Sequence, residues 1–196
     1  AFKQRKAMTG LEYKAKSYLH ANCAHCHREN AGGMVNALMY FEKHTQDASL
    51  IEASPLRGNF DLADAKVIAP GDPFSSVLYY RMAKSGSGQM PHLGRTRVDI
   101  DGLNHIFDWI SSMPVNKDKT TNSKDWVLRQ IKTILAQEAL SEMERELEKL
   151  LGNSQGALGL AYALDHDWLS ATQQNSAQNV FNDIEPLLSR ENLSRY

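Results

Sequence analysis

Apolar residues recur at intervals of three and four near the start of the chain, which is the spacing of one face of an α-helix. Between about Thr9 and His20 this face is formed by Leu11, Ala15 and Leu19, with Tyr18 beside them. The pattern predicts a first helix that leads directly into the segment NCAHCHR, residues 22–28.

Two more helices are predicted before residue 115. Asp72 followed by Pro73 has the composition of a helix start, with the aspartate as N-cap and the proline at the first helical position. This helix should run through VLYYRMAK and end in the glycine-rich stretch SGSGQMPHLG. A further amphipathic helix should start near Asp99 or Asp101 and stop at Met113, because Pro114 disfavours a helical conformation in the residue before it.

The stretch between these helices, residues 28–71, has weak periodicity and several glycines and prolines. It predicts loops with one or two short strands, around VNALMYF and AKVIA.

The composition changes at about residues 115–124, where VNKDKTTNSKD is polar and has no apolar period. We therefore divide the chain into a first domain, residues 1–116, and a helical extension or linker, residues 117–196. The extension carries amphipathic stretches whose apolar positions are Val127, Ile131, Ile134, Leu140, Met143, Leu147 and Leu150.

These stretches form either one long helix with a phase break or two helices, with Ser141 and Glu144 as a capping box at the second start. Gly152 should end the stretch, and shorter helices should follow at 156–164 and 176–184. Helices of this kind must bury their apolar faces, so a homodimer through them is a further prediction.

Composition and charge argue against a nucleic-acid-binding protein and against a transmembrane protein. Of the 196 residues, 42% are hydrophobic and 23% charged, as in an ordinary globular protein, and the net charge of −1 gives no basic surface for nucleic acid. No apolar run approaches the ~20 residues that a transmembrane helix needs, and the first ten residues lack the apolar centre of a signal peptide.

The two cysteines of the chain, Cys23 and Cys26, stand directly before His27 in CAHCH. This spacing fits a thioredoxin-like redox pair, half of a zinc site, or covalent attachment of haem. A redox pair belongs between a strand and a helix, whereas this motif follows a helix. A zinc site needs a fourth ligand, for which the candidates His20, His44, His92 and His105 have no favoured spacing.

Haem attachment accounts for all three residues at once. Cys23 and Cys26 would each bond a vinyl carbon of the porphyrin, and His27 would bind the iron. A methionine is a good sixth ligand, and Met90 lies in the flexible loop GSGQMPHLG, where Pro91 stiffens the approach. His92 is the rival ligand in the same loop.

The order of helix, CAHCH, helix, methionine–proline loop and last helix resembles the class I-type cytochromes c over about residues 9–114. In that family the first and last helices cross through a small residue and an aromatic one, and Ala15, Leu19 and Trp109 stand at the corresponding positions. The resemblance implies an all-α cytochrome c fold, here with long loops because Met90 lies 63 residues after His27 (90 − 27 = 63).

Three longer segments are similar to haem-binding domains of multi-domain secreted proteins of planctomycete-type bacteria: SYLHANCAHCHRENAGG, VIAPGDPFSSVLYYRMA and QMPHLG…VDIDGLNHIFDWI. This resemblance implies a piece of a larger, periplasmic or otherwise exported protein, whose targeting segment lies outside this sequence. A redox partner protein or a fused dehydrogenase module would then exchange electrons with it.

We therefore expect an electron carrier, not an enzyme, with one haem c whose iron is held by His27 and Met90. Arg81, Arg95 and Arg97 flank the ligand loop and have the planar charge that suits haem propionates, and Arg81 is the first choice. The alternative is a peroxidase-like or ligand-sensing haem domain with a labile or absent sixth ligand, in which His92 would act on the bound molecule.

Overall fold

The computed structural model describes residues 8–31, 36–45, 48–115 and 122–180. Within these ranges the secondary structure is helical, and the helices are α1 (Gly10–Cys23), η2 (Pro73–Ser75), α2 (Val77–Ala83), α3 (Ile100–Ser111), α4 (Ser123–Leu135), α5 (Leu140–Leu151) and α6 (Ser154–Asp165). Residues 171–180 are also helical. The all-α prediction is confirmed at this level, and no helix of the described residues is long and apolar enough to cross a membrane.

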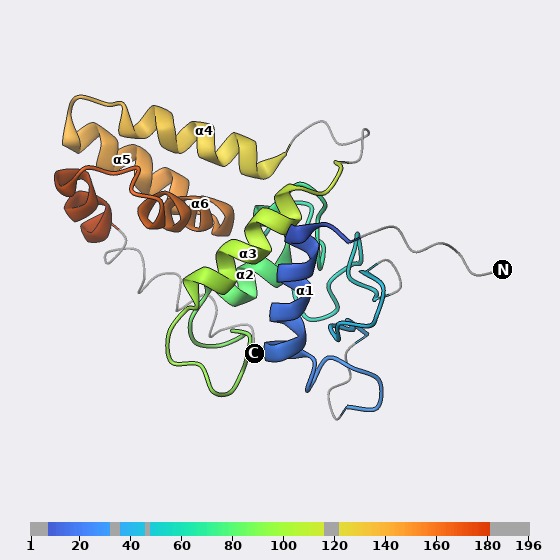
Figure 1. Cartoon of the computed structure of the whole chain (residues 1–196). Coiled ribbons are helices and arrows are strands. Elements are labelled where there is room, and N and C mark those ends of the chain that lie inside the picture. The colour runs from blue at the N-terminus through green and yellow to red at the C-terminus, as the bar shows by residue number, and fades with distance from the viewer. Residues whose placement is uncertain (1–7, 32–35, 46–47, 116–121, 181–196) are drawn as a thin grey trace.

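Figure 1 shows α1, α2 and α3 gathered on one side of the molecule and α4, α5 and α6 on the other. Helix α1 begins after Thr9, whose hydroxyl oxygen accepts the backbone N–H of Glu12, so the predicted start is confirmed. Helix α3 begins after Asp99, whose carboxylate accepts the N–H of Gly102, as the sequence predicts. It ends at Ser111, two residues before Met113.

Helices α1 and α3 pack against each other at a close crossing. Gly102 of α3 faces the ring of Tyr18 on α1, and a Cβ atom at this glycine would come within 2.1 Å of the tyrosine Cε2. Ala15, Leu19 and Trp109 are all buried. Gly102 and Tyr18 are thus a close pair of a small and an aromatic residue at this crossing, one that the sequence did not predict.

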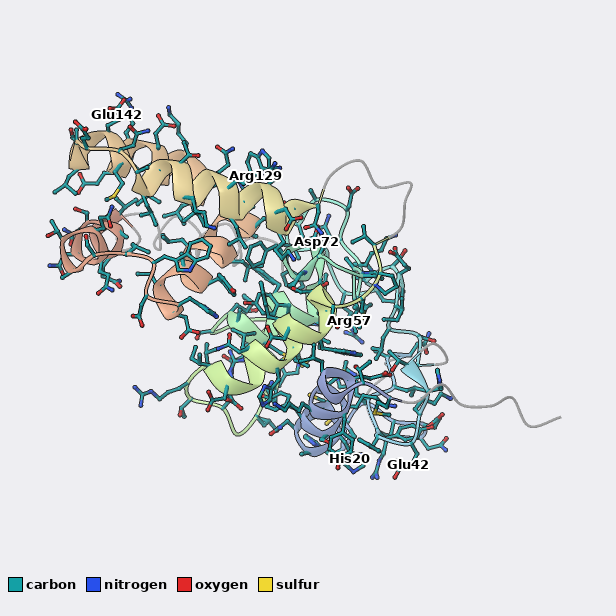
Figure 2. All side chains as sticks on the ribbon, turned by 45° about the horizontal axis from the view of Figure 1, so that its top comes forward. His20, Glu42, Arg57, Asp72, Arg129 and Glu142 are labelled. Carbon is teal, nitrogen blue, oxygen red and sulfur yellow. The ribbon has the colours of Figure 1, made fainter. Side chains whose placement is uncertain are left out.

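The predicted start of the second helix is wrong in its detail. Pro73 opens only the short 3₁₀ turn η2, and α2 begins four residues later, after Ser76. The carboxylate of Asp72, which is buried, instead accepts backbone N–H groups from Ser123 (2.7 Å) and Lys124 (3.1 Å) at the start of α4. Figure 2 labels Asp72 below the start of α4.

Two other predictions of local structure are also corrected. The sequence predicts short strands around 35–41, of which residue 35 lies outside the described residues, and around 65–69. The described residues contain instead two isolated bridges, Ile51 with Ile68 and Lys66 with Ser76. Helix α5 begins at Leu140 after Ala139, with no side-chain cap, so Ser141 is not the cap residue. Two separate helices, α4 and α5, stand where one long helix was the alternative, and Gly152 ends α5 as predicted.

The helices of the extension share one buried cluster with the rest of the chain. Phe74 is fully buried between the two groups, with ring centroids 5.9 Å from Phe107 on α3 and 6.4 Å from Tyr162 on α6. Gly159 of α6 lies so close to Val127 of α4 that a Cβ atom there would approach the valine Cγ1 within 2.2 Å. Of the apolar positions that suggested a homodimer, all except Leu140 are buried within the chain, and a dimer stays a prediction.

Part of the predicted extension lies outside the described residues. This holds for residues 116–121 of the polar boundary and for residues 181–184 of the last predicted helix. The helix that the structure describes at 171–180 begins five residues before the predicted start at 176.

Asp72 is expected to be the main polar anchor between the two groups of helices. The substitution Asp72→Ala removes a charged acceptor of two backbone N–H groups and of the Ser75 hydroxyl, and should lower the free energy of unfolding by about 2 kcal/mol. Urea denaturation followed by circular dichroism measures the change. Asp101→Ala, at an exposed acid in the first turn of α3, is the control and should cost about 0.5 kcal/mol. Equal effects of the two substitutions would contradict the anchor.

Candidate functional site

The CAHCH motif lies at the C-terminal end of α1 and continues its helical path for one turn. Cys23 is the last residue of the helix, and its carbonyl accepts the N–H groups of Cys26 (3.1 Å) and His27 (2.9 Å). Residues three and four apart on a helical turn lie on the same side. The backbone therefore places Cys23, Cys26 and His27 along one side of the end of α1.

The imidazole of His27 is oriented by a backbone carbonyl. Its Nδ1 lies 3.1 Å from the carbonyl oxygen of Ala37, and the backbone N–H of Met39 donates to the carbonyl of His27 at 2.8 Å. When Nδ1–H donates to a carbonyl, the lone pair lies on Nε2, which is the arrangement of a histidine that binds a metal through Nε2. The segment around Ala37 thus fixes both the ring and the backbone of His27.

Partial burial keeps this ring in its neutral form. Burial is the largest cause that lowers the pKa of His27, and the positive charge of Arg81 and the nearby rings of His25 and His92 lower it further. The hydrogen bond to Ala37 acts in the opposite direction but does not cancel these effects. Neutral imidazole is the form that binds a metal ion, so the environment of His27 suits a ligand.

The two cysteines differ in environment. Both are free thiols, but Cys26 is exposed whereas Cys23 is half-buried, and burial raises the pKa of the Cys23 thiol to about 11. A redox-active CxxC pair needs a first cysteine whose thiolate is stabilised, commonly at a helix N-terminus. Cys23 has the opposite surroundings, at a helix C-terminus, so the structure argues against the thioredoxin-like reading.

The loop that carries Met90 is brought to the same region by α2. Arg81, on the last turn of α2, is the residue that links them: its carbonyl accepts the N–H of Met90 at 2.8 Å, and its Nε donates to the carbonyl of Gly88 at 2.8 Å. The same guanidinium also affects the pKa of His27. Arg81 and His92 are therefore both close enough to His27 to change its pKa. Met90 and Pro91, which directly precede His92 in the chain, are half-buried.

The residues present fit a covalently attached haem better than a zinc ion. No group of three or more histidine, cysteine or acidic side chains among the described residues is arranged to hold a metal ion, so Cys23, Cys26 and His27 have no fourth protein ligand gathered around them. A haem iron takes four ligands from the porphyrin, and the chain must supply only the axial ones. One oriented histidine with two neighbouring thiols, and a methionine loop near by, satisfies that need.

Arg95 and Tyr18 also belong to this region, and their contacts were not predicted from the sequence. Tyr18 forms a hydrogen bond with Asp99, and its pKa is raised mainly by burial, with contributions from Asp99 and Cys23 and an opposing one from Arg95. Arg95 bonds to backbone carbonyls rather than to an acidic side chain. A sequence cannot reveal such contacts, because the acceptors are backbone atoms.

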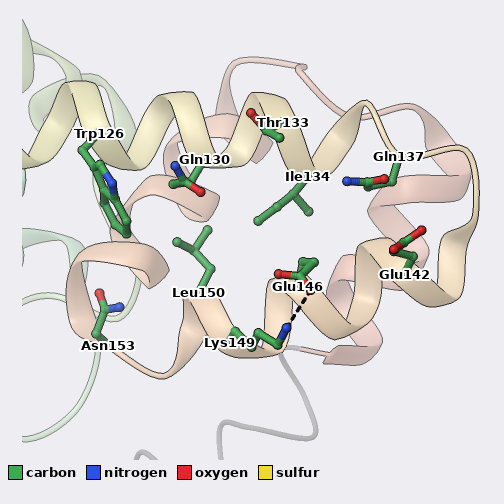
Figure 3. Close-up of a pocket in the computed structure, with 10 residues that line it drawn as sticks. All are labelled: Trp126, Gln130, Thr133, Ile134, Gln137, Glu142, Glu146, Lys149, Leu150 and Asn153. Atoms are coloured by element: carbon green, nitrogen blue, oxygen red, sulfur yellow. Dashed lines mark hydrogen bonds and ion pairs between the residues drawn. The ribbon is translucent and has the colours of Figure 1, made fainter.

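A groove lies between α4 and α5, far from the CAHCH motif. It has a volume of about 290 Å³ and is lined by side chains that include Trp126, Ile134 and Leu150. Figure 3 shows the ion pair of Lys149 with Glu146 (2.7 Å) on its rim. This groove holds no arrangement of acid, base and nucleophile that would indicate chemistry.

Comparison of the chain with protein-family models, with curated protein sequences and with solved structures found no significant match.

The difference between the two thiols is testable in protein that carries no modification at either cysteine. Because the pKa of Cys23 is about 11, its thiolate is scarce below pH 10 and becomes abundant only as the pH rises toward that value. Iodoacetamide at pH 8 should therefore alkylate Cys26 at least about tenfold faster than Cys23 in the folded chain. Peptide mass spectrometry gives both rates, and the urea-denatured chain is the control, in which the rates should converge. Equal rates in the folded chain would contradict the described burial.

Proposed function

We propose that this chain is an electron-transfer domain that carries one haem c, attached through Cys23 and Cys26, with His27 and Met90 as axial ligands. The observation that carries the proposal is the hydrogen bond of His27 Nδ1 to the Ala37 carbonyl, which leaves the lone pair of Nε2 available to a metal ion. When bound, the haem iron supplies one-electron redox chemistry.

The roles of the residues follow from their chemistry. The thiols of Cys23 and Cys26 would hold the group covalently, and Nε2 of His27 would bind the iron. The thioether of Met90 would favour the ferrous state and so raise the reduction potential relative to a second histidine. With both axial positions taken by the chain, a substrate would have no place on the iron, so the domain would pass single electrons to another protein.

The electron partner is proposed as a separate redox protein or a fused dehydrogenase module in an exported protein. The exposed side chains of His25, Cys26 and Leu93, of which the last is 87% exposed, lie on the two segments that would surround the haem. A partner that docks over them would approach the redox centre closely.

The position of His92 supports a second candidate function, in which the iron is not bound by Met90. It is exposed, it lies two residues after Met90, and it is close enough to affect the pKa of His27. If His92 and not Met90 faces the iron, the domain either has a bis-histidine centre or retains an exchangeable site for a small molecule.

The visible spectrum of protein produced with a cytochrome maturation system tests the ligand set. The ferric protein should be low-spin and show the weak red absorption of methionine sulfur on iron. Met90→Ala should abolish this red band, because it removes the sulfur ligand, whereas His92→Ala should leave it in place.

Met113→Leu is the matched control, since Met113 is another half-buried methionine beside a proline, and it should retain the band. Loss of the band in His92→Ala but not in Met90→Ala would overturn the assignment of Met90. A high-spin ferric spectrum of the unsubstituted protein would favour the ligand-sensing or peroxidase-like function instead.

A further inference from the structure

Both backbone polar groups of Met90 are hydrogen-bonded, one to α2 directly and the other to the Arg95 side chain, which also binds the end of α2. The N–H of Met90 donates to the carbonyl of Arg81, and the carbonyl of Met90 accepts a hydrogen bond from Nη1 of Arg95 at 2.8 Å. Arg95 does not belong to α2 but follows Met90 by five residues in the same loop. The loop is therefore closed on itself through the Arg95 side chain.

The Arg95 guanidinium also binds the C-terminal carbonyls of α2. Its Nη1 donates to the carbonyl of Met82 at 2.6 Å, and its Nη2 donates to the carbonyl of Lys84. The last carbonyls of a helix have no partner within the helix, and a positive charge next to them is favourable. The Arg95 side chain thus donates hydrogen bonds to carbonyls at the end of α2 and also to the carbonyl of Met90.

We propose that Arg95 is a positioning residue that fixes the Met90 backbone on the end of α2 and so presents the thioether to the iron. This inference rests on the function proposed above. It replaces the expectation that Arg95 pairs with a haem propionate, because its observed contacts are to three backbone carbonyls.

The loop needs such a clamp because its own backbone is permissive. Gly86, Gly88 and Gly94 all have positive φ, of 79°, 78° and 75°, a region that glycine adopts at little cost, and glycine has more accessible backbone conformations than any other residue. Methionine sulfur is a neutral, exchangeable ligand, so its hold on the iron depends on how much freedom the loop loses when the bond forms. A loop held in place beforehand would lose little, and its methionine would compete better with ligands from solution.

The chemistry of the clamp is specific to arginine. A guanidinium has several N–H donors in a fixed plane, and here two of its nitrogens reach three carbonyls. The single ammonium nitrogen of a lysine cannot occupy both nitrogen positions. Arg95→Lys should therefore keep the charge near the end of α2 but only part of the hold on Met90.

The test is the binding of imidazole to the iron of the haem-loaded ferric protein in competition with Met90, followed in every variant by the change in the visible absorption spectrum of the haem. Arg95→Ala should lower the imidazole concentration at half-saturation by about tenfold, since one charge-assisted hydrogen bond is worth at least such a factor. Arg95→Lys should fall between Arg95→Ala and the unsubstituted protein. Circular dichroism and haem content should stay unchanged, which separates a loosened ligand from a loss of fold.

Arg129→Ala, at an exposed arginine on α4 (Figure 2), is the matched control and should bind imidazole as the unsubstituted protein does. Met90→Ala marks the limit without the sulfur ligand. If Met90→Ala shifts the half-saturation but both Arg95 variants do not, the positioning role is overturned while the ligand assignment stands. If Met90→Ala and the unsubstituted protein bind imidazole alike, Met90 is not the ligand and both proposals fail. Should Arg95→Ala lose helicity, the Arg95→Lys result decides.

Discussion

The crossing of α1 and α3 is the constraint on which the candidate site depends. Tyr18 on α1 lies directly over Gly102, in the first turn of α3, and is hydrogen-bonded to Asp99 at the start of that helix. Cys23 lies at the end of α1, whereas the loop with Met90 leads into the start of α3. The close contact between these two helices therefore joins segments more than sixty residues apart, one that ends in the CAHCH motif and one that is preceded by the loop with Met90.

The helices after residue 122 contribute to the same structure instead of forming an independent layer. Phe74 lies in the short turn η2, directly before α2, and packs against rings from both α3 and α6. Asp72 in front of it accepts N–H groups from the start of α4. Because the carbonyl of Arg81 on α2 in turn accepts the N–H of Met90, the C-terminal helices are connected to the loop with Met90 through packed and hydrogen-bonded residues. They are expected to stabilise that loop.

The sequence predicts the parts of this protein that depend on local pattern. Apolar spacing and N-cap residues locate α1 and α3 to within a few residues, because Thr9 and Asp99 cap the helices that directly follow them. The same rule gives a wrong prediction for Asp72. Its carboxylate accepts a hydrogen bond from the start of α4, some fifty residues away, and no local sequence pattern indicates such a partner. The partner of His27 is likewise invisible in the sequence, because a backbone carbonyl is present at every residue and only the fold selects Ala37.

The intact mass of the denatured protein, produced with a cytochrome maturation system, tests most directly whether Cys23 and Cys26 hold a haem. We predict the mass of the chain plus one haem, retained after acid and organic solvent have unfolded the protein. The double variant Cys23→Ala, Cys26→Ala should show the mass of its bare chain. If the unsubstituted protein also has the mass of the bare chain, the covalent haem is contradicted, and with it the electron-transfer function proposed for His27 and Met90.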